Sequence, residues 1–335
     1  MKAMVLEENA PIESSPLALR ELPDPRPEAG EVRVQVRCCA ICRTDLHVIE
    51  GELPRQELPI IPGHQVVGVV DQVGPNCRRL SVGQRVGIAW LRHTCGTCRF
   101  CRRGRENLCE ASRFTGYHAD GGYAEYAVVP EDFAYAIPAA FADAEATPLL
   151  CAGIIGYRAL KRCNLPRGGR LALYGFGSSA HVVIQIARHR GCEVYVATRG
   201  ASHRELAGRM GATWVGAEAD ELPVKVDSAI IFAPAGNLVP PALAALEKGG
   251  TLALAGIYMT DVPALQYERH LFYERDVHSV TANTHEDGRE LLAEAAVIPI
   301  RPHVTTYSLA DANRALQDLK ADRINGTGVL VIGPS

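Results

Sequence analysis

The sequence has no long apolar run, no excess of positive charge and no block of like charges. Its apolar stretches fall short of the ~20 residues that a membrane-spanning helix needs. It carries 35 Lys and Arg against 38 Asp and Glu, a net charge of −3, which gives no basic face for nucleic acid. Residues 1–8 lack the apolar core of a signal peptide. We therefore expect a cytoplasmic protein with neither membrane nor nucleic acid as a partner.

Length and composition indicate a two-domain globular protein. A chain of 335 residues can bury two separate cores, and 47% hydrophobic with 22% charged residues is typical of globular proteins. The chain also has eleven cysteines, an odd number. In a reducing compartment, metal ligands together with reduced thiols explain that number better than disulfides do.

Four cysteines lie within fifteen residues, separated by short spacers. Such spacers allow one loop to fold four thiolates around a single Zn²⁺, which accepts four sulfurs tetrahedrally. Two disulfides or an iron–sulfur cluster are the alternatives. Because all four coordination positions are filled, this zinc is expected to be structural. Its ligands are Cys95, Cys98, Cys101 and Cys109.

The first third of the chain shows the alternation of half-buried strands. Val32, Val34 and Val36 fall on one face of an extended segment. Residues 66–73 and 82–89 are further strand candidates, with turns of Gly, Pro and Asn between them. Many short strands separated by such turns predict a compact β-rich domain.

The pattern changes near residue 150 to alternating strands and helices. This alternation predicts a parallel sheet with crossover helices. The expected strands are 171–174, 194–197, 229–232 and 252–255, and the expected helices are 178–190, 204–210 and 239–246. A closing strand at 329–332 is expected to return to the first domain.

A glycine-rich turn follows the strand at 171–174 and opens the next helix. The first glycine permits a tight turn, the second allows close approach of a pyrophosphate, and a small third residue lets helix and strand pack closely. Free N–H groups at the helix N-terminus then hold the diphosphate. An ordinary glycine turn is the alternative for these residues taken alone. The pattern is G-x-G-x-x-A, with Gly175, Gly177, Ser178, Ser179 and Ala180 as candidate contacts.

The end of the next strand bears on the choice of cofactor. An acidic residue there normally binds the ribose 2′-hydroxyl of NAD. This chain has Thr198 followed by Arg199, and Arg199 can pair with a 2′-phosphate, helped by Arg204. A solvated loop arginine is the alternative. We therefore favour NADP as the cofactor and keep NAD as the alternative.

Three further candidate metal ligands are far apart in sequence, and spacing alone does not unite them. Cys42 begins a segment that holds a thiol, a hydroxyl, a carboxylate and an imidazole within six residues. His64 follows a Pro-Gly turn, and Cys151 lies just before the dinucleotide half. A buried cysteine without a metal is the alternative for each thiol.

With these contexts the chain resembles, end to end, the zinc-dependent medium-chain alcohol dehydrogenases, in particular the cinnamyl and primary alcohol dehydrogenase-like branch. The resemblance implies a chaperonin-10-like β-rich catalytic domain (1–152 and 286–335) and a Rossmann domain with a doubly wound parallel sheet (153–285). It also implies an active site between the domains and a homodimer or homotetramer. The matching segments are the four-cysteine loop, 42–47, 62–64, 116–126, 150–153 and 175–180.

The resemblance also implies a catalytic zinc bound by Cys42, His64 and Cys151. Two sulfurs and one nitrogen leave a fourth position open for water or substrate, which is a catalytic arrangement. In this family Asp45 would orient His64 by accepting its distal N–H. Arg43 would contact the cofactor pyrophosphate. The chain is thus expected to hold two zinc ions, one catalytic and one structural.

Three more residues take roles from the resemblance. Thr44 corresponds to the first hydroxyl of a proton relay, and His47 corresponds to its terminal base. Trp90 corresponds to an aromatic residue of the substrate pocket, although core packing explains it nearly as well. Two positions depart from the family pattern: Gln65 replaces a common glutamate, and Thr327 stands where relatives often carry an arginine.

The expected function is a zinc-dependent alcohol dehydrogenase or aldehyde reductase that transfers hydride between a primary alcohol or aldehyde and NAD(P). Zn²⁺ lowers the pKa of a bound hydroxyl and polarises a carbonyl, while the nicotinamide exchanges hydride. A polyol dehydrogenase of the same fold is the first alternative. A zinc-binding structural relative without catalysis is the second.

Overall fold

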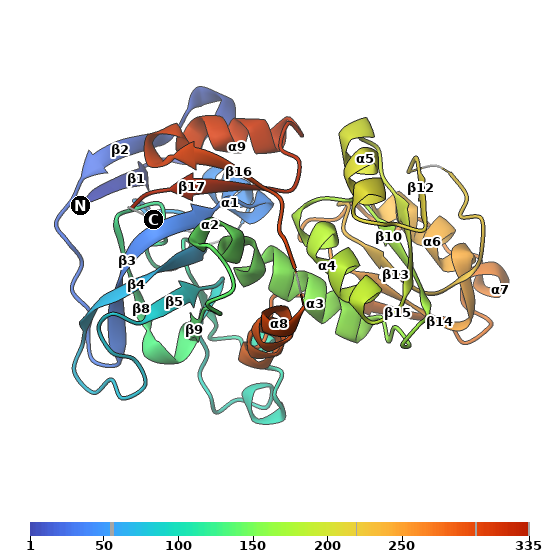
Figure 1. Ribbon diagram of the computed structural model, residues 1–335, viewed down its shortest axis with the longest axis horizontal. Helices are drawn as coiled ribbons and strands as arrows, with labels where there is room; N and C mark the ends of the chain where they lie inside the picture. The colour runs from blue at the N-terminus through green and yellow to red at the C-terminus, as the bar shows by residue number, and fades with distance from the viewer. Residues whose placement is uncertain (54–56, 219, 299, 334–335) are drawn as a thin grey trace. The chain divides into compact units, whose positions relative to one another are not determined.

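The structure, a computed structural model, describes residues 1–53, 57–218, 220–298 and 300–333. It divides into two compact units (Figure 1). The first comprises Met1–Cys151, Ala282–Val297 and Pro302–Ser335, and the second comprises Ala152–Thr281 and Ile298–Arg301. The domain limits expected from the sequence, at 152 and 285, stay a prediction.

The first unit is built on a seven-stranded sheet. Its strand order is β16-β17-β3-β4-β5-β9, and β8 also pairs with β3. Two smaller sheets join β1 to β2 and β6 to β7. The strands are β1 (Lys2–Leu6), β2 (Leu17–Glu21), β3 (Glu31–Ala40), β4 (Gln65–Val73), β5 (Arg85–Ile88), β6 (Leu91–His93), β7 (Arg113–Phe114), β8 (Tyr126–Pro130), β9 (Ala134–Ala136), β16 (Val304–Ser308) and β17 (Thr327–Val331).

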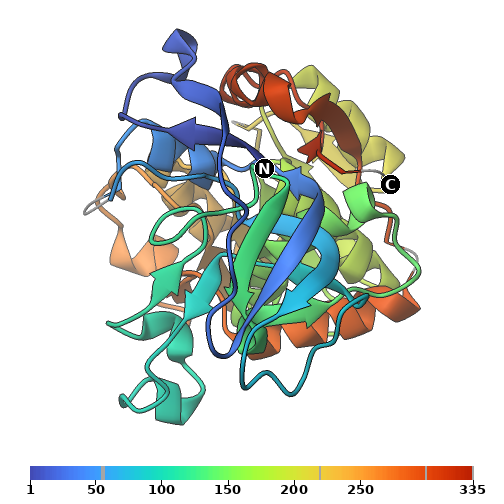
Figure 2. The same cartoon turned by 90° about the vertical axis from the view of Figure 1, so that its left-hand side faces the viewer.

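The alternation predicted for β3 is confirmed. Val32, Val34 and Val36 are fully buried, while Gln35 on the opposite face is exposed. The strand pairs antiparallel with β4 along most of its length and with β8 over Glu31–Gln35, and in Figure 2 it lies between them. Its last residues pair with β17, so the closing strand returns to this sheet as predicted. Strand β3 therefore forms the centre of the first core.

The helices of the first unit range from four residues in α2 to thirteen in α8. Helix α1 starts three residues after β3 ends, and α9 lies against it. The helices are α1 (Arg43–Ile49), α2 (Asp143–Ala146), α8 (His285–Val297) and α9 (Ala312–Lys320). The 3₁₀ turns are η1 (Ile12–Ser14), η2 (Cys101–Arg103), η3 (Glu106–Leu108), η4 (Glu131–Phe133), η5 (Thr147–Leu150) and η7 (Leu309–Asp311).

The second unit is a six-stranded sheet whose neighbouring strands are all parallel, in the order β12-β11-β10-β13-β14-β15. Its strands are β10 (Arg170–Tyr174), β11 (Glu193–Ala197), β12 (Trp214–Gly216), β13 (Val226–Ile231), β14 (Leu246–Leu254) and β15 (Asp276–Ser279). Its helices are α3 (Ala152–Arg162), α4 (Ser178–His189), α5 (Ala201–Arg209), α6 (Val239–Ala245) and α7 (Tyr267–His270), with the turn η6 (Gly236–Leu238).

The strand order of this sheet reverses at β10, which gives the doubly wound arrangement predicted from the sequence. The chain moves from β10 outward through β11 to β12 and then crosses to β13 on the other side. Because such crossovers are right-handed, α4 and α6 cover opposite faces of the sheet. Ligands of this fold bind beyond the carboxyl ends of the strands at the reversal point, which is where the glycine-rich turn lies.

One predicted strand is shorter in the structure. The segment expected at 82–89 forms a strand only over β5. Val82 is largely exposed, and Gly83 has a positive φ of 89°, so the turn extends further into the segment than its apolar residues indicated. Among the described residues, no helix has the length and apolar character that crossing a membrane requires.

The packing of β4 against β3 gives the first testable prediction. A Cβ at Gly68 would lie 2.2 Å from the carbonyl oxygen of Gln35, a backbone atom that cannot move without disturbing the sheet. We expect Gly68→Ala to lower stability by about 1–3 kcal/mol, measured as a lower thermal unfolding midpoint by calorimetry. Gly208→Ala, in α5 with open space around the new carbon, is the control and should be neutral or stabilising. Equal midpoints for the two variants would contradict this account of the sheet.

Candidate metal and dinucleotide sites

Cys42, His64 and Cys151 come together in the first unit. Cys42 caps the N-terminus of α1, His64 immediately precedes β4, and Cys151 follows η5. Their ligand atoms all lie within 4.8 Å of one another. The structure thus brings together three residues that the sequence separates by up to about a hundred positions.

The position of His64 depends on the glycine before it. Gly63 has φ +97°, a conformation that residues with a side chain rarely adopt. A Cβ there would also lie 2.3 Å from the Tyr123 ring. The Pro-Gly turn therefore lets the chain pass close under Tyr123 and present His64 at the start of β4.

The carboxylate of Asp45 is the main polar partner of His64. Its Oδ1 accepts the Nδ1 hydrogen of His64 at 2.9 Å, and its Oδ2 accepts the backbone N–H of Cys42 at 2.8 Å and the Tyr123 hydroxyl at 3.0 Å. Asp45 is only 1% exposed. A buried carboxylate needs such donors, because an unpaired one would be strongly destabilising.

The second imidazole nitrogen of His64, Nε2, is a candidate metal ligand. His64 Nε2 is buried and has no hydrogen-bond partner. Burial lowers the pKa of His64, but the Asp45 charge and hydrogen bond outweigh this and raise it to about 10. A hydrogen bond with Cys151 lowers the pKa of the Cys42 thiol well below its usual value. An orphaned nitrogen beside two sulfurs is a donor set that fits Zn²⁺.

The remaining predicted residues of this site surround the cluster. The Thr44 hydroxyl lies 3.6 Å from Cys42 Sγ. His47 in α1 is mostly buried, 15% exposed, with its Nδ1 against the Glu52 carboxylate. The Trp90 ring makes an edge contact with His64, at 4.9 Å between centroids, and stacks on two further rings, those of Phe114 and Tyr117. Arg43 is exposed in the first turn of α1, and the Gln65 amide lies 3.4 Å from the carbonyl of Ile41.

The four-cysteine loop forms a second cluster, with its sulfurs within 4.8 Å of one another. All eleven cysteines lie within the described residues and none is in a disulfide, so the disulfide alternative is not what the structure shows. Backbone N–H groups of Cys98, Cys101 and Cys95 point at neighbouring sulfurs at 3.3–3.5 Å. Donors of this kind stabilise thiolate over thiol.

Two thiols of this loop have pKa values shifted in opposite directions. Backbone N–H groups of Thr97 and Cys98 lower the pKa of Cys95 to about 6. Desolvation and the neighbouring thiols raise the pKa of Cys101 to about 12. A dication bound by all four sulfurs would neutralise this repulsion, so the loop fits a tetrathiolate zinc with no open position.

In the second unit the glycine-rich turn has the geometry that a diphosphate needs. Gly175 has φ +88° and lies so close to Ala233 that a Cβ would be 3.1 Å from its backbone nitrogen. Gly177 is the N-cap residue of α4, and a Cβ added there would meet no atom within 4 Å. Ser178 and Ser179 are the first two residues of α4, and Ala180 is fully buried against the sheet.

The end of β11 carries the residues expected to choose between cofactors. Thr198 is buried directly after the strand, and Arg199 next to it is 77% exposed. Arg199 Nε lies 3.5 Å from the carboxylate of Glu218, and the two residues line a hollow of about 800 Å³. Arg204 donates instead to the carbonyl oxygens of Thr198 and Arg199.

Three contacts were missed by sequence reasoning. Glu52 lies five residues after His47, a spacing that could have indicated a partner just beyond α1. Glu218 pairs with Arg199 because β12 lies beside β11, and nothing in the local sequence marks it. Tyr123 belongs to a segment that matched the family, but its bond to Asp45, 78 positions away, has no local sequence signal.

Comparison with known proteins gives matches in both parts of the chain. Residues 28–139 match the family described as the alcohol dehydrogenase GroES-like domain, and residues 180–296 match the zinc-binding dehydrogenase family. The chain is 52% identical to a probable alcohol dehydrogenase, AdhA, of Mycobacterium tuberculosis (strain CDC 1551 / Oshkosh). That match covers 99% of this chain and 97% of the relative.

Solved structures agree with these matches. A cinnamyl alcohol dehydrogenase of Sorghum bicolor superposes with a TM-score of 0.89 at 26% identity, covering 98% of this chain and 97% of that one. A cobalt- and zinc-bound thermostable alcohol dehydrogenase of Pyrobaculum aerophilum gives 0.87 at 28% identity, covering 100% and 99%. The chain therefore belongs to the zinc-binding medium-chain alcohol dehydrogenase family, and it is an oxidoreductase with a GroES-like unit and a Rossmann-like unit.

Proposed function

We propose that this alcohol dehydrogenase interconverts a primary alcohol and its aldehyde at a zinc held by Cys42, His64 and Cys151. The observation that carries the proposal is the buried His64 Nε2, which has no partner, in a residue whose ligand atom lies within 4.8 Å of the Cys42 and Cys151 sulfurs. When bound, zinc supplies a Lewis acid that lowers the pKa of an alcohol and polarises a carbonyl, and a nicotinamide supplies the hydride acceptor.

The chain's own residues orient the substrate side of this site and move its proton. Asp45 holds the imidazole of His64 in the tautomer that leaves Nε2 free for a cation. Thr44, whose hydroxyl lies beside Cys42, is the first group able to take a proton from an alcohol. His47 in α1, whose Nδ1 lies against the Glu52 carboxylate, would receive that proton. Trp90 lies against His64 and is proposed as one wall of the substrate pocket.

The four-cysteine loop is proposed to hold the second, structural zinc. Support comes from its closed set of four sulfurs and from the backbone donors around them. We also propose that the two compact units correspond to the catalytic and dinucleotide-binding domains, and that the chain assembles as a homodimer or homotetramer.

The glycine-rich turn, from Gly175 to Ala180, is proposed to hold the pyrophosphate of the cofactor, and Arg43 is proposed as a second contact for it. For the adenosine ribose we propose NADP, because Thr198 offers no carboxylate and Arg199 is an exposed cation. The Glu218 carboxylate counts against a strong preference. It offsets the charge of Arg199 and would repel a 2′-phosphate bound there.

The metal assignment is tested by elemental analysis of the purified protein together with turnover on a panel of primary alcohols. We expect about two zinc ions per chain, and Cys151→Ser should retain about one and lose activity. Cys77→Ser is the matched control: Cys77 belongs to neither metal cluster, and its thiol donates to the carbonyl of Glu31, a bond that serine can also make. A Cys151→Ser protein that keeps both ions would exclude the proposed ligand set.

The same measurements distinguish the alternative functions. A polyol dehydrogenase would turn over polyols better than primary alcohols, and an inactive relative would bind zinc without turnover.

The proton relay predicts a pH-dependent loss of activity. We expect His47→Gln to lower kcat at least about tenfold at acidic pH, with zinc content unchanged. The loss should shrink towards alkaline pH, because hydroxide can then accept the proton directly. The measurement is the pH profile of kcat, with His189→Gln, at an exposed position of α4, as the control. A loss of equal size at every pH would rule out the relay role of His47.

The Arg199–Glu218 pair predicts a change of cofactor preference. We expect Glu218→Gln to raise kcat/KM for NADPH about two- to fivefold and to leave the value for NADH nearly unchanged. The control is Glu205→Gln, which makes the same chemical change at an exposed carboxylate paired with Arg209. A gain of similar size with both reduced cofactors would show that the pair does not contact the 2′-phosphate.

A further inference from the structure

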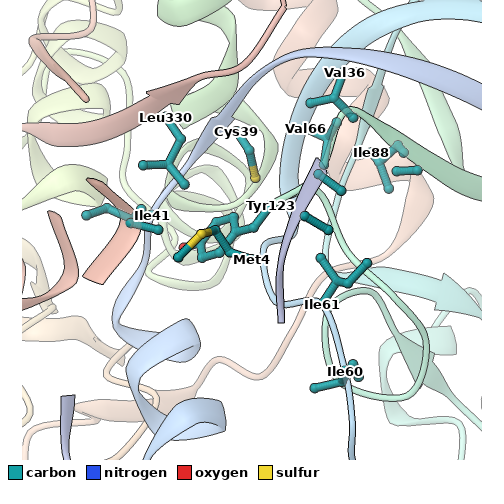
Figure 3. Packing of buried hydrophobic residues seen from close by; sticks show 14 of the residues in the cluster. Met4, Val36, Cys39, Ile41, Ile60, Ile61, Val66, Ile88, Tyr123 and Leu330 are labelled. Carbon is teal, nitrogen blue, oxygen red and sulfur yellow. The ribbon is translucent and has the colours of Figure 1, made fainter. Parts of the chain in front are cut away.

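Tyr123 is a fully buried tyrosine whose hydroxyl meets the carboxylate that orients the metal-ligand candidate His64. Its ring lies in the first core among apolar side chains, beside Met4 and near Cys39 and Ile41 (Figure 3). The hydroxyl at the end of this ring donates to Asp45 Oδ2 at 3.0 Å. Because apolar side chains surround the ring, the buried hydroxyl depends on that carboxylate oxygen for its hydrogen bond.

The backbone around Tyr123 is tied to the turn that presents His64. The N–H groups of Gly121, Gly122 and Tyr123 donate to the carbonyls of residues 61, 63 and 62 at 2.7, 2.8 and 3.0 Å. The ring lies so close to Gly63 that no Cβ fits between them. Tyr123 is therefore fixed against the turn at residues 61–63, and its hydroxyl contacts Asp45 from that position.

Three donors hold the carboxylate of Asp45, one at Oδ1 and two at Oδ2. His64 Nδ1 binds Oδ1, whereas Oδ2 takes the Cys42 backbone N–H and the Tyr123 hydroxyl. The N–H of Cys42 belongs to the helix cap and fixes Oδ2 from the side of α1. The Tyr123 hydroxyl also donates to Oδ2 and comes from the loop that precedes β8. Two donors from different segments leave the carboxylate one orientation, and in it Oδ1 faces His64.

We propose that Tyr123 is a positioning residue for the catalytic metal: its hydroxyl fixes Asp45, which in turn keeps His64 Nε2 aimed at the ion. The inference rests on the proposed zinc site of Cys42, His64 and Cys151. Outer partners of a metal ligand typically change metal affinity by 10- to 100-fold when removed. Tyr123 is one residue further out than Asp45, so the lower end of that range applies.

The test is the rate at which a chromogenic chelator removes zinc from the loaded enzyme. Tyr123→Phe keeps the ring that packs against Gly63 and removes only the hydroxyl. We expect the ion of the Cys42–His64–Cys151 site to leave about tenfold faster, with the release from the four-cysteine loop unchanged. The release phase that is missing in Cys151→Ser identifies the first ion. The four-cysteine loop thus serves as a control inside the same molecule, because a general loss of stability would accelerate both phases.

Tyr307→Phe is the matched variant. The Tyr307 hydroxyl also donates to an aspartate, Asp318 Oδ2, at 3.0 Å, but it belongs to neither metal cluster. It should leave both release phases as in the parent protein. In an Asp45→Ala background, Tyr123→Phe should add no further acceleration, because the hydroxyl then has no carboxylate to act through.

The outcomes separate the two proposals. If the parent protein shows a single release phase from the four-cysteine loop, the proposed catalytic zinc is wrong and this inference fails with it. If the parent protein shows both phases and Tyr123→Phe leaves them unchanged, or accelerates both equally, the role of Tyr123 alone is overturned.

Discussion

The hydrogen bond between Asp45 and His64 is the interaction on which the proposed chemistry depends. It joins α1 to the start of β4 and takes up one nitrogen of the imidazole, so that the other nitrogen is left without a partner. Burial makes this arrangement stable only if the carboxylate is fully hydrogen-bonded, and the Cys42 N–H and the Tyr123 hydroxyl complete it. The site is thus pre-organised by the protein, and a cation would find its ligands already in place.

The two units solve different physical problems with different secondary structure. In the first, a mostly antiparallel sheet and tight glycine turns bring distant thiols and an imidazole together, because such turns let backbones approach closely. In the second, parallel strands end at one edge, where the glycine-rich turn leads into the N-terminus of α4. Family membership agrees with both, since the two matched segments fall one in each half of the chain.

Much of this could be predicted from the sequence, for identifiable reasons. The valine alternation of β3 and the glycine-rich turn before α4 are local patterns set by backbone geometry, and both are found where expected. Contacts between segments far apart in the chain could not be predicted from local sequence patterns. The Tyr123–Asp45 bond depends on hydrogen bonds between residues 121–123 and 61–63. The Arg199–Glu218 pair depends on β12 lying beside β11. Arg199 alone suggests NADP, and its neighbour changes the strength of that argument.

The central claim is that His64 Nε2, Cys42 and Cys151 bind one zinc ion whose fourth position is open to substrate. The most direct measurement is anomalous diffraction at the zinc edge from crystals of the zinc-loaded protein. The account predicts an anomalous peak about 2.0–2.1 Å from His64 Nε2 and about 2.3 Å from each sulfur, with no protein atom at the fourth vertex. A peak among the four cysteines with none beside His64, or a protein side chain at the fourth vertex, would contradict it.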